Sequence, residues 1–365
     1  MQVGNDASPL PRPLYQRVVG VDDGYSDIKI CGSEISCQLV NGSTAIPGMK
    51  TFGSVIERGG STGNIDGRIR NRWQVGGETF TVAPFAAGER LEFDHYHWSP
   101  ENQVLIYHYL ASAGWSGKDI DLLVVGLPMS SFFELETGGL SANVERKIAN
   151  LRFAPVPLGE TIKPPRSIGD IIVRPQGLLS FFDYCVDWNG RSRVDAPPRV
   201  AVIDIGGRTT DLAFIVGGAE IDRKYSKSIN IGVLNVCREL NAALRDRYKV
   251  SIDFPLERLK LALRTGRVNI RGTESDVGDL VDDQVRAIGG NLWRQVQAEM
   301  EGLAVADLIL LVGGGASVFD RVRPSAISGV VIPQDPEYAN VRGMWKFGFC
   351  RLAQEAARAS RAGSP

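Results

Sequence analysis

One short pattern occurs twice in this sequence and constrains the fold more than any other feature. Asp22-x-Gly24 with Lys29 (18–31, VVGVDDGYSDIKIC) can be laid on Asp204-x-Gly206 with Asp211 (200–216, VAVIDIGGRTTDLAFIV). Apolar, often β-branched residues flank a glycine-containing turn in both stretches, which predicts two β-hairpins. Each hairpin is followed by a predicted helix and a buried apolar strand: one lies within 119–130 and ends at Gly-Leu-Pro, and the other lies within 306–320 and leads into a glycine-rich turn. We therefore expect an α/β protein in which one domain plan is duplicated, with a cleft between the copies.

Other segments carry helix and loop signals. Ser99-Pro100-Glu101 marks a helix start, whereas 36–87 has many glycines and short strand-like pieces, which predicts a loop-rich antiparallel region. Asp195-Ala196-Pro197-Pro198 indicates a linker. Apolar spacing predicts helices over 173–186, 232–248, 254–266, 279–300 and 340–363.

These elements suggest domain boundaries. Residues 1–14, rich in proline, are expected to be a flexible leader. The first domain is expected to comprise residues 15–175 together with 332–365, and the second residues 176–331.

Composition excludes some classes of protein. Lys plus Arg number 41 against 42 Asp plus Glu, a net charge of −1, so no overall charge favours nucleic acid as a direct partner. The five cysteines are scattered without a CxxC pair, which favours reduced thiols over disulfides or structural zinc. Neither a signal peptide nor a membrane helix is recognisable. The sequence thus predicts a cytoplasmic protein.

The glycine turns indicate phosphate binding. A turn of glycines and hydroxyl residues presents several backbone N–H groups to one space, and such a nest binds anions. Two nests across a cleft would hold the phosphates of a nucleotide, with Asp22 and Asp204 binding Mg²⁺ through water. Lys29 would add a positive charge among the phosphates. The third turn, LVGGGAS (311–317), offers a flat surface for the adenosine end.

Each of these turns alone would more often be an ordinary hairpin or strand-to-helix turn, but the set favours a nucleotide site. A dinucleotide fold is excluded because Val318 occupies the third glycine position after Gly313 and Gly315. His95 and His97 could bind metal, although a polar surface cluster is the favoured interpretation. RIRNRW (68–73) could contact an acidic partner or DNA, with a solvated loop as the default.

Across about residues 17–349 the sequence resembles the actin-like ATPases, most closely the ParM/StbA plasmid-segregation branch. The resemblance lies in VGVDDGYSDIK, IDIGGRTTDLA and ILLVGGGAS, in this order, with GLPMS and ANVRGMWKFG leaning toward ParM. It implies two ribonuclease-H-like domains, ATP with Mg²⁺ between them, and head-to-tail polymerisation coupled to hydrolysis.

The resemblance also implies residue roles. Asp22 and Asp204 match the two acids near Mg²⁺, and Lys29 matches the lysine that contacts phosphate. Gln176 stands at the water-positioning position, where ParM-type relatives often carry Glu; Asp211 is expected to help order water. The catalytic set is therefore Gln176, Asp204, Asp211 and Asp22. The expected nucleotide contacts are Asp23, Gly24, Tyr25, Ser26, Lys29, Gly206, Gly207, Arg208, Thr209, Thr210, Gly232, Glu257, Gly313, Gly314, Gly315 and Ala316.

The preferred function is a filament-forming, Mg²⁺-dependent ATPase that segregates plasmid or other replicon DNA through a DNA-binding adaptor. Its partners would be further copies of itself and that adaptor, without sequence-specific DNA contact or a membrane. A non-polymerising ATPase or a small-molecule kinase of the same superfamily is the alternative. A kinase needs a base that accepts a hydroxyl proton, and no clear candidate is visible beyond the nucleotide set.

Overall fold

A computed structural model describes residues 13–40, 44–60, 66–83, 91–134, 139–218 and 220–362. Nearly all of the predicted leader, residues 1–12, lies outside the described residues. The first described element is a 3₁₀ turn, η1 (Leu14–Gln16), which leads directly into the first strand.

The first sheet is built around the predicted hairpin at 18–31. β1 (Val18–Asp23) is buried along its whole length and runs antiparallel to β2 (Asp27–Val40). Over the described residues the strand order is β3-β2-β1-β7-β9, in which β1, β7 and β9 are parallel. The other strands of this sheet are β3 (Thr44–Gly53), β7 (Asp119–Leu127) and β9 (Ser167–Pro175).

The second sheet repeats this arrangement. β10 (Arg199–Ile205) is antiparallel to β11 (Thr210–Val216) and parallel to β16 (Leu308–Val312). Within the described chain its order is β12-β11-β10-β16-β17, with β13 also paired to β11. The short strands are β12 (Glu220–Ile221), β13 (Lys227–Ile229) and β17 (Val330–Val331). The matching order and directions confirm the predicted duplicated α/β plan.

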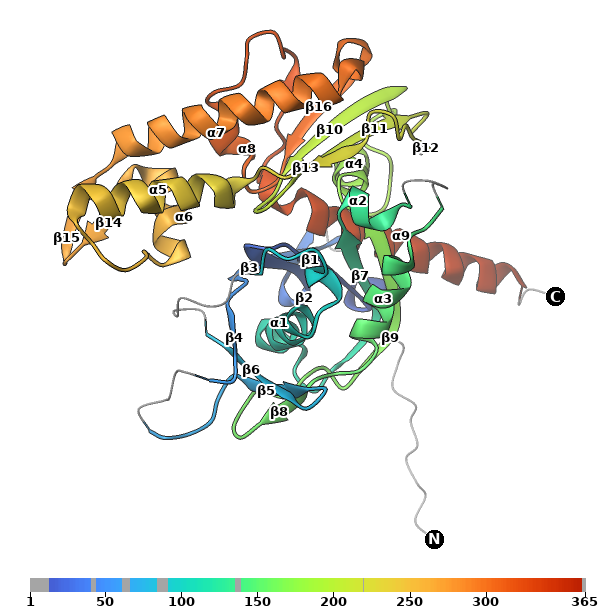
Figure 1. The fold of residues 1–365 in the computed structure, drawn as a ribbon. Coiled ribbons are helices and arrows are strands. Elements are labelled where there is room, and N and C mark those ends of the chain that lie inside the picture. Colours follow the sequence, from blue (N-terminus) through green and yellow to red (C-terminus); the bar gives the residue numbers. More distant parts are fainter. Residues whose placement is uncertain are drawn as a thin grey trace.

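Helices cover both faces of each sheet, which is why the central strands are apolar on both sides. In the second sheet, Ala201 and Ile203 pack toward α5 to α8, while Val200 and Val202 pack toward α4 (Figure 1). The described helices are α1 (Pro100–Leu110), α2 (Met129–Phe132), α3 (Ala142–Leu151), α4 (Leu178–Cys185), α5 (Val233–Tyr248), α6 (Leu256–Thr265), α7 (Gly278–Glu299), α8 (Ala316–Asp320) and α9 (Ala339–Ala362).

Helices α4 and α9 lie between the two sheets (Figure 1). Leu179 of α4 packs in the core against the first sheet, whereas Phe181 of the same helix packs in the core against the second. The chain passes from the first half to the second through α4 and returns through α9. The far end of α9 extends beyond the sheets (Figure 1).

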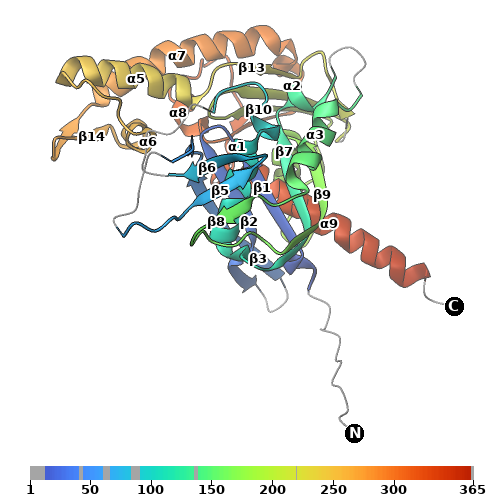
Figure 2. The same ribbon diagram turned by 60° about the horizontal axis from the view of Figure 1, so that its bottom comes forward.

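The outer parts of the two halves differ. The first half carries a small antiparallel sheet, β4-β6-β5-β8, and the second a β14–β15 hairpin beyond α5 and α6 (Figures 1 and 2). The small sheet confirms the predicted antiparallel region. Its strands and the remaining short elements are β4 (Ile56–Arg58), β5 (Arg72–Val75), β6 (Glu78–Val82), β8 (Val156–Leu158), β14 (Arg267–Ile270), β15 (Thr273–Asp276), the 3₁₀ helices η2 (Tyr96–Trp98), η4 (Glu301–Val305) and η5 (Pro336–Tyr338), and the π-helical η3 (Ala111–Trp115).

Two sequence expectations need correction. The helix expected over 173–186 begins only at Leu178, because Val173–Pro175 ends β9 and Gly177 turns the chain at φ +80°. His97 does not lie on a surface, since it is 1% exposed. By contrast, the Ser99 cap is confirmed, with its hydroxyl accepting a hydrogen bond from the backbone N–H of Asn102.

Cys31, Cys185, Cys237 and Cys350 are free thiols, as expected, whereas the side chain of Cys37 lies outside the description. Among the described residues, none of the helices combines the length and the apolar character needed to span a membrane.

Candidate functional site

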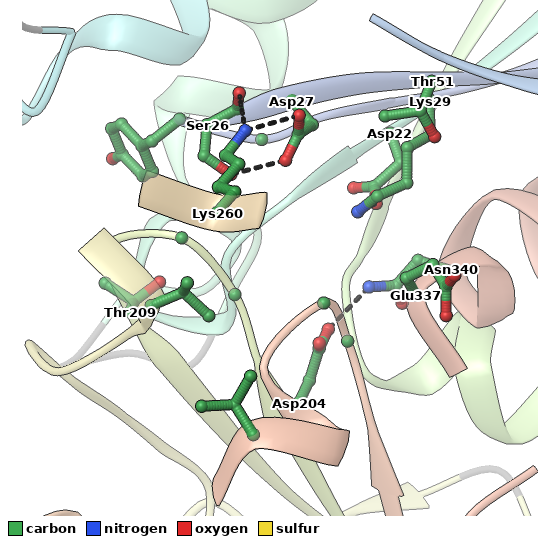
Figure 3. A pocket seen from close by; sticks show the side chains of 18 of the residues that line it. Asp22, Ser26, Asp27, Lys29, Thr51, Asp204, Thr209, Lys260, Glu337 and Asn340 are labelled. Carbon is green, nitrogen blue, oxygen red and sulfur yellow. Dashed lines mark hydrogen bonds and ion pairs between the residues drawn. The ribbon is translucent and has the colours of Figure 1, made fainter. Parts of the chain in front are cut away.

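A cavity of about 470 Å³ lies between the two halves, where the turns of the two predicted hairpins meet. Figure 3 shows Asp22, Ser26 and Lys29 of the first hairpin on one side of it and Asp204 and Thr209 of the second on the other. The turns approach closely, because a Cβ built on Gly207 would lie 2.9 Å from the Cβ of Ser26. Only a residue without a side chain allows this approach.

On the first side, a charged pair sits beside an amide. Lys29 Nζ lies 3.3 Å from Asp22 Oδ2, and Gln176 Nε2 donates to Asp22 Oδ1 at 3.0 Å. Burial alone would lower the pKa of Lys29, but the carboxylates of Asp22, Asp27 and Asp204 outweigh it and raise that pKa. Lys29 is therefore a fixed positive charge in the cavity wall.

On the second side, the end of β10 places Asp204 in the wall. Its Oδ2 accepts a hydrogen bond from Asn340 Nδ2 at 2.5 Å. Burial, followed by the nearby charges of Asp22 and Asp211, raises the pKa of Asp204 to about 7. Asp22, Asp204 and Asp211 thus repel one another in this part of the cavity. A bound cation would reduce that repulsion.

The third turn packs against this carboxylate. Gly313 has φ +88°, and a Cβ there would lie 2.4 Å from Asp204 Oδ1 and from the carbonyl oxygen of Ile205. Its neighbour Gly314 has open space around it and also lines the cavity. Glycine at 313 is thus required by both conformation and space.

The second hairpin turn is held by the start of α5. The backbone N–H of Val233 donates to the carbonyl of Gly206 at 3.1 Å, and that of Leu234 to the carbonyl of Gly207 at 2.8 Å. A Cβ on Gly232 would lie 2.4 Å from the Gly207 carbonyl oxygen. Gly232 therefore serves this close packing and does not line the cavity; its expected contact with nucleotide stays a prediction.

Side chains from α6 reach across the cavity to the first hairpin. Lys260 Nζ donates to Asp27 Oδ1 at 2.7 Å and to the carbonyl of Ser26 at 3.1 Å (Figure 3). Glu257, one turn earlier, also lines the cavity. Lys260 was not among the residues expected from the sequence, because its contact with Asp27 joins residues 233 positions apart. Asn340 lies within the motif ANVRG, but the motif gave it no role.

The structure brings most of the expected site residues into one cavity wall. They are Asp22, Gly24, Tyr25, Ser26, Lys29, Gln176, Asp204, Gly206, Gly207, Thr209, Asp211, Glu257, Gly313 and Gly314.

Apart from Gly232, five expected contacts lie elsewhere: Asp23, Arg208, Thr210, Gly315 and Ala316. Thr210 donates its hydroxyl to the carbonyl of Ile231, and Arg208 is ion-paired with Asp94 at 2.7 Å. A Cβ on Gly315 would lie 2.4 Å from Ile205 Cγ2, so this glycine permits close packing. Ala316 is fully buried at the start of α8.

Asp23 belongs to a buried cluster behind the wall. Its Oδ2 accepts hydrogen bonds from Lys147, Asn102 and His97. Burial alone would raise the pKa of Asp23, but Lys147 and His97 outweigh it, so that pKa is lowered. Oδ2 of Asp23 therefore has three donors, and the residue does not line the cavity; its expected nucleotide contact stays a prediction.

Two family descriptions match parts of the chain. Residues 61–165 match plasmid segregation protein ParM, N-terminal, and residues 202–322 match archaeal actin homologue MreB-like, C-terminal. A comparison with curated protein sequences found no match.

Solved structures match nearly the whole chain. The archaeal actin homolog Ta0583 superposes with a TM-score of 0.65 at 22% identity, covering 92% of this chain and 99% of its own. The chain has an actin-like fold. A 15-stranded ParM filament from Clostridium botulinum gives 0.63 at 18% identity, with coverages of 91% and 98%. Actin-like protein Alp7A gives 0.66 at 14% identity, with coverages of 94% and 99%. The actin-like fold expected from the sequence motifs is therefore confirmed.

The carboxylates of the cavity suit a hydrated cation. Asp22 and Asp204 are each 5% exposed and face the same cavity from opposite sheets. No group of three or more acidic, histidine or cysteine side chains among the described residues is arranged to hold a metal directly. Mg²⁺ usually keeps several waters and binds through one or two carboxylates plus substrate phosphates. The two carboxylates therefore fit Mg²⁺ that is bound together with a phosphate ligand.

Proposed function

We propose that this protein binds ATP with Mg²⁺ in the cavity and hydrolyses it. We further propose that it assembles head to tail into filaments that segregate plasmid or other replicon DNA through a DNA-binding adaptor. One observation carries the proposal: two glycine-containing turns, one from each half, meet at a cavity that also holds Asp22, Lys29 and Asp204. Backbone N–H groups, a lysine and two carboxylates are the components of a site for a nucleotide triphosphate with Mg²⁺.

Different residues of the cavity would contact the phosphates and the base of the nucleotide. Ser26, Gly207 and Thr209 would surround the phosphates with backbone and hydroxyl donors, and Lys29 would add positive charge. The end of the cavity lined by Leu263, Val318 and Arg321 offers apolar surface beside a cation. That end would accommodate the base, which would lie against the bare backbone of Gly314.

The same residues suit in-line attack by water on the terminal phosphate. Gln176 donates its amide N–H to Asp22, which directs the amide oxygen to accept a hydrogen bond from water. Since an amide takes up no proton at neutral pH, Gln176 orients the water and does not act as a base. When bound, Mg²⁺ would neutralise charge on the phosphates. Lys29 would stabilise the charge that develops on the departing oxygen.

Filament formation and the adaptor are supported by likeness and by charge. A ParM filament shares the fold, and residues 61–165 match the ParM N-terminal family. The net charge is −1, and the exposed arginines of RIRNRW do not form a free basic patch, because Arg68 and Arg70 are ion-paired with Asp66 and Glu160. Contact with DNA through an adaptor fits these charges better than direct binding, which needs clustered free cations.

Sedimentation tests the whole proposal. The purified protein is spun with Mg²⁺ and ATP, with Mg²⁺ and ADP, or without nucleotide, and phosphate release is assayed in the same tubes. We expect ATP-dependent pelleting and phosphate release without any added acceptor. Asp204→Asn should lose both. Asp246→Asn, whose carboxylate is 86% exposed, should retain both.

Other outcomes separate the alternatives. Phosphate release without pelleting at any protein concentration would overturn the filament proposal and favour a non-polymerising ATPase. Release that requires an added hydroxyl compound would instead indicate a small-molecule kinase. Absence of ATP binding would reject the assignment of the cavity.

A further inference from the structure

The loop after α5 and the β14–β15 hairpin enclose an apolar groove in the second half. Its volume is about 270 Å³, and its apolar lining comes from Val250, Ile252, Phe254 and Ile270. The groove shares no lining residue with the nucleotide cavity. Ile252 is 73% exposed, although isoleucine is among the residues most often buried. A large apolar side chain left open beside a groove indicates a surface that another molecule covers.

The rim of this groove is basic. Arg258 and Arg271 line it, and neither forms an ion pair with any residue that the structure describes. The other charged residues of the rim, Lys249 and Asp253, are each ion-paired with a neighbour on α5. The groove therefore presents two positive charges without a compensating acid, and we call it the basic groove.

The backbone of Arg271 is held by a tight turn. Arg271 and Gly272 form the two-residue connection between β14 and β15, with φ values of +51° and +86°. Positive φ at both central residues is typical of a type I′ turn, whose twist matches that of the paired strands. Because the turn is already formed, binding of a partner there would cost little backbone ordering.

A second exposed apolar surface follows α7. The 3₁₀ helix η4 (Glu301–Val305) leaves Val305 57% exposed. Residues 301–307 include two acids, Glu301 and Asp307, and no cation. Glu301 forms no ion pair among the described residues. We call residues 301–307 the acidic segment.

Helix α7 separates the two surfaces. It begins at Gly278, two residues after the end of β15, and ends at Glu299, two residues before η4. Its 22 residues, at about 1.5 Å each, span roughly 33 Å. Figure 1 shows β14 and β15 at one end of α7, and β16, which follows the acidic segment, at the other. The basic groove and the acidic segment therefore lie at opposite ends of one helix.

Charge decides how two copies of the chain can combine these surfaces. Groove against groove would bring Arg258 and Arg271 close to the same arginines of the other copy, and like charges at an interface are unfavourable. Acidic segment against acidic segment would do the same with Glu301. Groove against acidic segment instead pairs opposite charges around the apolar side chains of Ile252 and Val305. Such a contact is heterologous, and with its two surfaces at opposite ends of α7 it repeats into an open chain of copies.

We infer that the acidic segment of one copy docks into the basic groove of the next and forms the head-to-tail contact of the filament, an inference that rests on the proposed filament function. Val305 enters the groove beside Ile252, and Glu301 pairs with Arg271. The second halves then follow one another along the direction of α7. Neither surface includes a residue that lines the nucleotide cavity, so substitutions in them leave the ATP site intact.

Charge reversal tests this contact. Arg271→Glu, Glu301→Arg and the variant with both changes are sedimented with Mg²⁺ and ATP over a range of protein concentrations. Binding of a fluorescent ATP analogue and thermal stability are measured for each. We expect each single variant to need at least about fivefold more protein to pellet, because an attractive surface pair becomes a repulsive one. The double variant should pellet within about twofold of the concentration that the unmodified protein needs, because it restores the pair.

An equimolar mixture of the two single variants gives a sharper readout. In a chain of alternating copies, one junction joins both altered surfaces and the next joins both original surfaces. Every junction then pairs opposite charges. The mixture should therefore pellet at a protein concentration at which neither variant pellets alone. General damage to folding does not produce this recovery.

Arg286→Glu is the matched control, because Arg286 lies near the middle of α7 and its side chain is 69% exposed. This variant should pellet like the unmodified protein. If Arg271→Glu does not fold, Arg258→Glu takes its place, since Arg258 belongs to the same rim.

The assignment of the contact is overturned if the single variants pellet like the unmodified protein, or if Arg286→Glu impairs pelleting equally. It is also overturned if neither the double variant nor the mixture recovers pelleting. In each case, ATP-dependent pelleting of the unmodified protein still supports the proposed filament. If the unmodified protein binds ATP and never pellets, the proposed filament fails, and this contact fails with it.

Discussion

Asp22 and Asp204, the two carboxylates that would hold Mg²⁺, are each hydrogen-bonded to a segment that connects the halves of the molecule. Asp22 accepts a hydrogen bond from Gln176, which stands just before α4, and Asp204 accepts one from Asn340 in α9. Asn340 also accepts hydrogen bonds from the N–H of Gly177 and the hydroxyl of Ser180. A ligand that changes the bonding of either carboxylate therefore acts directly on the connecting helices.

Gly313 offers a test of how tightly the third turn is built. Gly313→Ala would place a methyl group 2.4 Å from Asp204 Oδ1 in a backbone conformation at φ +88°. We expect the free energy of unfolding in urea to fall by roughly 1–3 kcal/mol, the cost of such local strain.

Gly314→Ala is the control for this change, because nothing lies within 4 Å of a Cβ there. Gly314→Ala should change the free energy of unfolding by no more than about 0.5 kcal/mol. Equal effects of the two substitutions would show that the close contact at Gly313 does not determine stability.

At the residue scale, the sequence predicted the site where chemistry and position in the turn coincide. Asp22, Lys29 and Asp204 sit at strand ends, and their place in the cavity follows from the hairpin pattern. Asp23 follows Asp22 directly, but alternation along β1 turns its side chain to the opposite face of the sheet. Lys260 and Asn340 could not be predicted, because their contacts join residues more than 100 positions apart.

At the scale of elements, α4 and α9 approach each other most closely at a glycine. A Cβ on Gly343 of α9 would lie 1.9 Å from the carbonyl oxygen of Leu179 in α4. Asp183 of α4 also forms buried ion pairs with Arg342 at 2.8 Å and Lys346 at 2.7 Å. Removing the acid would leave both cations unpaired in the interior.

Gly343→Ala should therefore force the two helices apart. We expect the free energy of unfolding to fall by about 3 kcal/mol, at the upper end of what overpacking costs. The measurement is the urea midpoint followed by circular dichroism.

Gly290→Ala provides the comparison, since Gly290 also lies within a long helix but has nothing within 4 Å of a Cβ. There the better helix propensity of alanine should leave stability unchanged or raise it by up to about 1 kcal/mol. A loss at 290 as large as at 343 would contradict this account of the helix contact.

Predictability differed among the elements. The hairpins, α1, the helices from α5 to α7 and α9 carry a clear periodicity or an end signal, and the structure has them where they were expected. The short α8 was not expected, because its residues follow the glycine-rich turn without a helical pattern of their own. β9 gave little signal, because its first residues are polar and partly exposed at the edge of the first sheet. The short β8 is recognisable only through its pairing with β5, and such pairing depends on tertiary structure.

At the scale of the whole molecule, ion pairs between described residues of hairpin, loop and helix join the halves beside the cavity. Lys260 pairs with Asp27, Arg208 with Asp94 and Arg238 with Glu92. The Lys260–Asp27 pair is the most buried, with side chains 10% and 22% exposed, so it contributes more than its exposed counterparts. These contacts favour the arrangement in which the halves are close together.

Lys260→Met should shift the nucleotide-free protein toward arrangements with the halves farther apart. Losing a charged hydrogen bond of about 1.5–3 kcal/mol changes the ratio of the two arrangements by roughly 10- to 100-fold. Small-angle X-ray scattering should then give a larger radius of gyration.

Lys249→Met is the matched control, because its ammonium group is on the surface, where the side chain is 80% exposed and pairs with Asp246. Its scattering should match that of the unmodified protein. Superimposable curves for all three proteins would mean that Lys260 does not hold the halves together.

The duplicated architecture was the most predictable property of the whole molecule, because both halves of the sequence show the same order of hairpin, helix and apolar strand. How the halves meet was not predictable, since it depends on single contacts such as Lys260 with Asp27. Domain boundaries at 175/176 and 331/332 remain a prediction; the sheets are consistent with them, as the first sheet ends at Pro175 and the second at Val331.

The two crossings of the chain, through α4 and α9, lie side by side between the two sheets (Figure 1). Because the two halves are joined covalently at these two neighbouring segments, the segments define an axis. A rotation of one half relative to the other about this axis would stretch the connections less than a rotation about any other direction. Displacement then grows in proportion to distance from the axis. In such a rotation the carboxylates bonded to the crossings would move little, while the small sheet of the first half and the β14–β15 hairpin of the second would move much farther. A ligand that turned the halves about this axis would therefore change the outline of the molecule far more than the cavity itself.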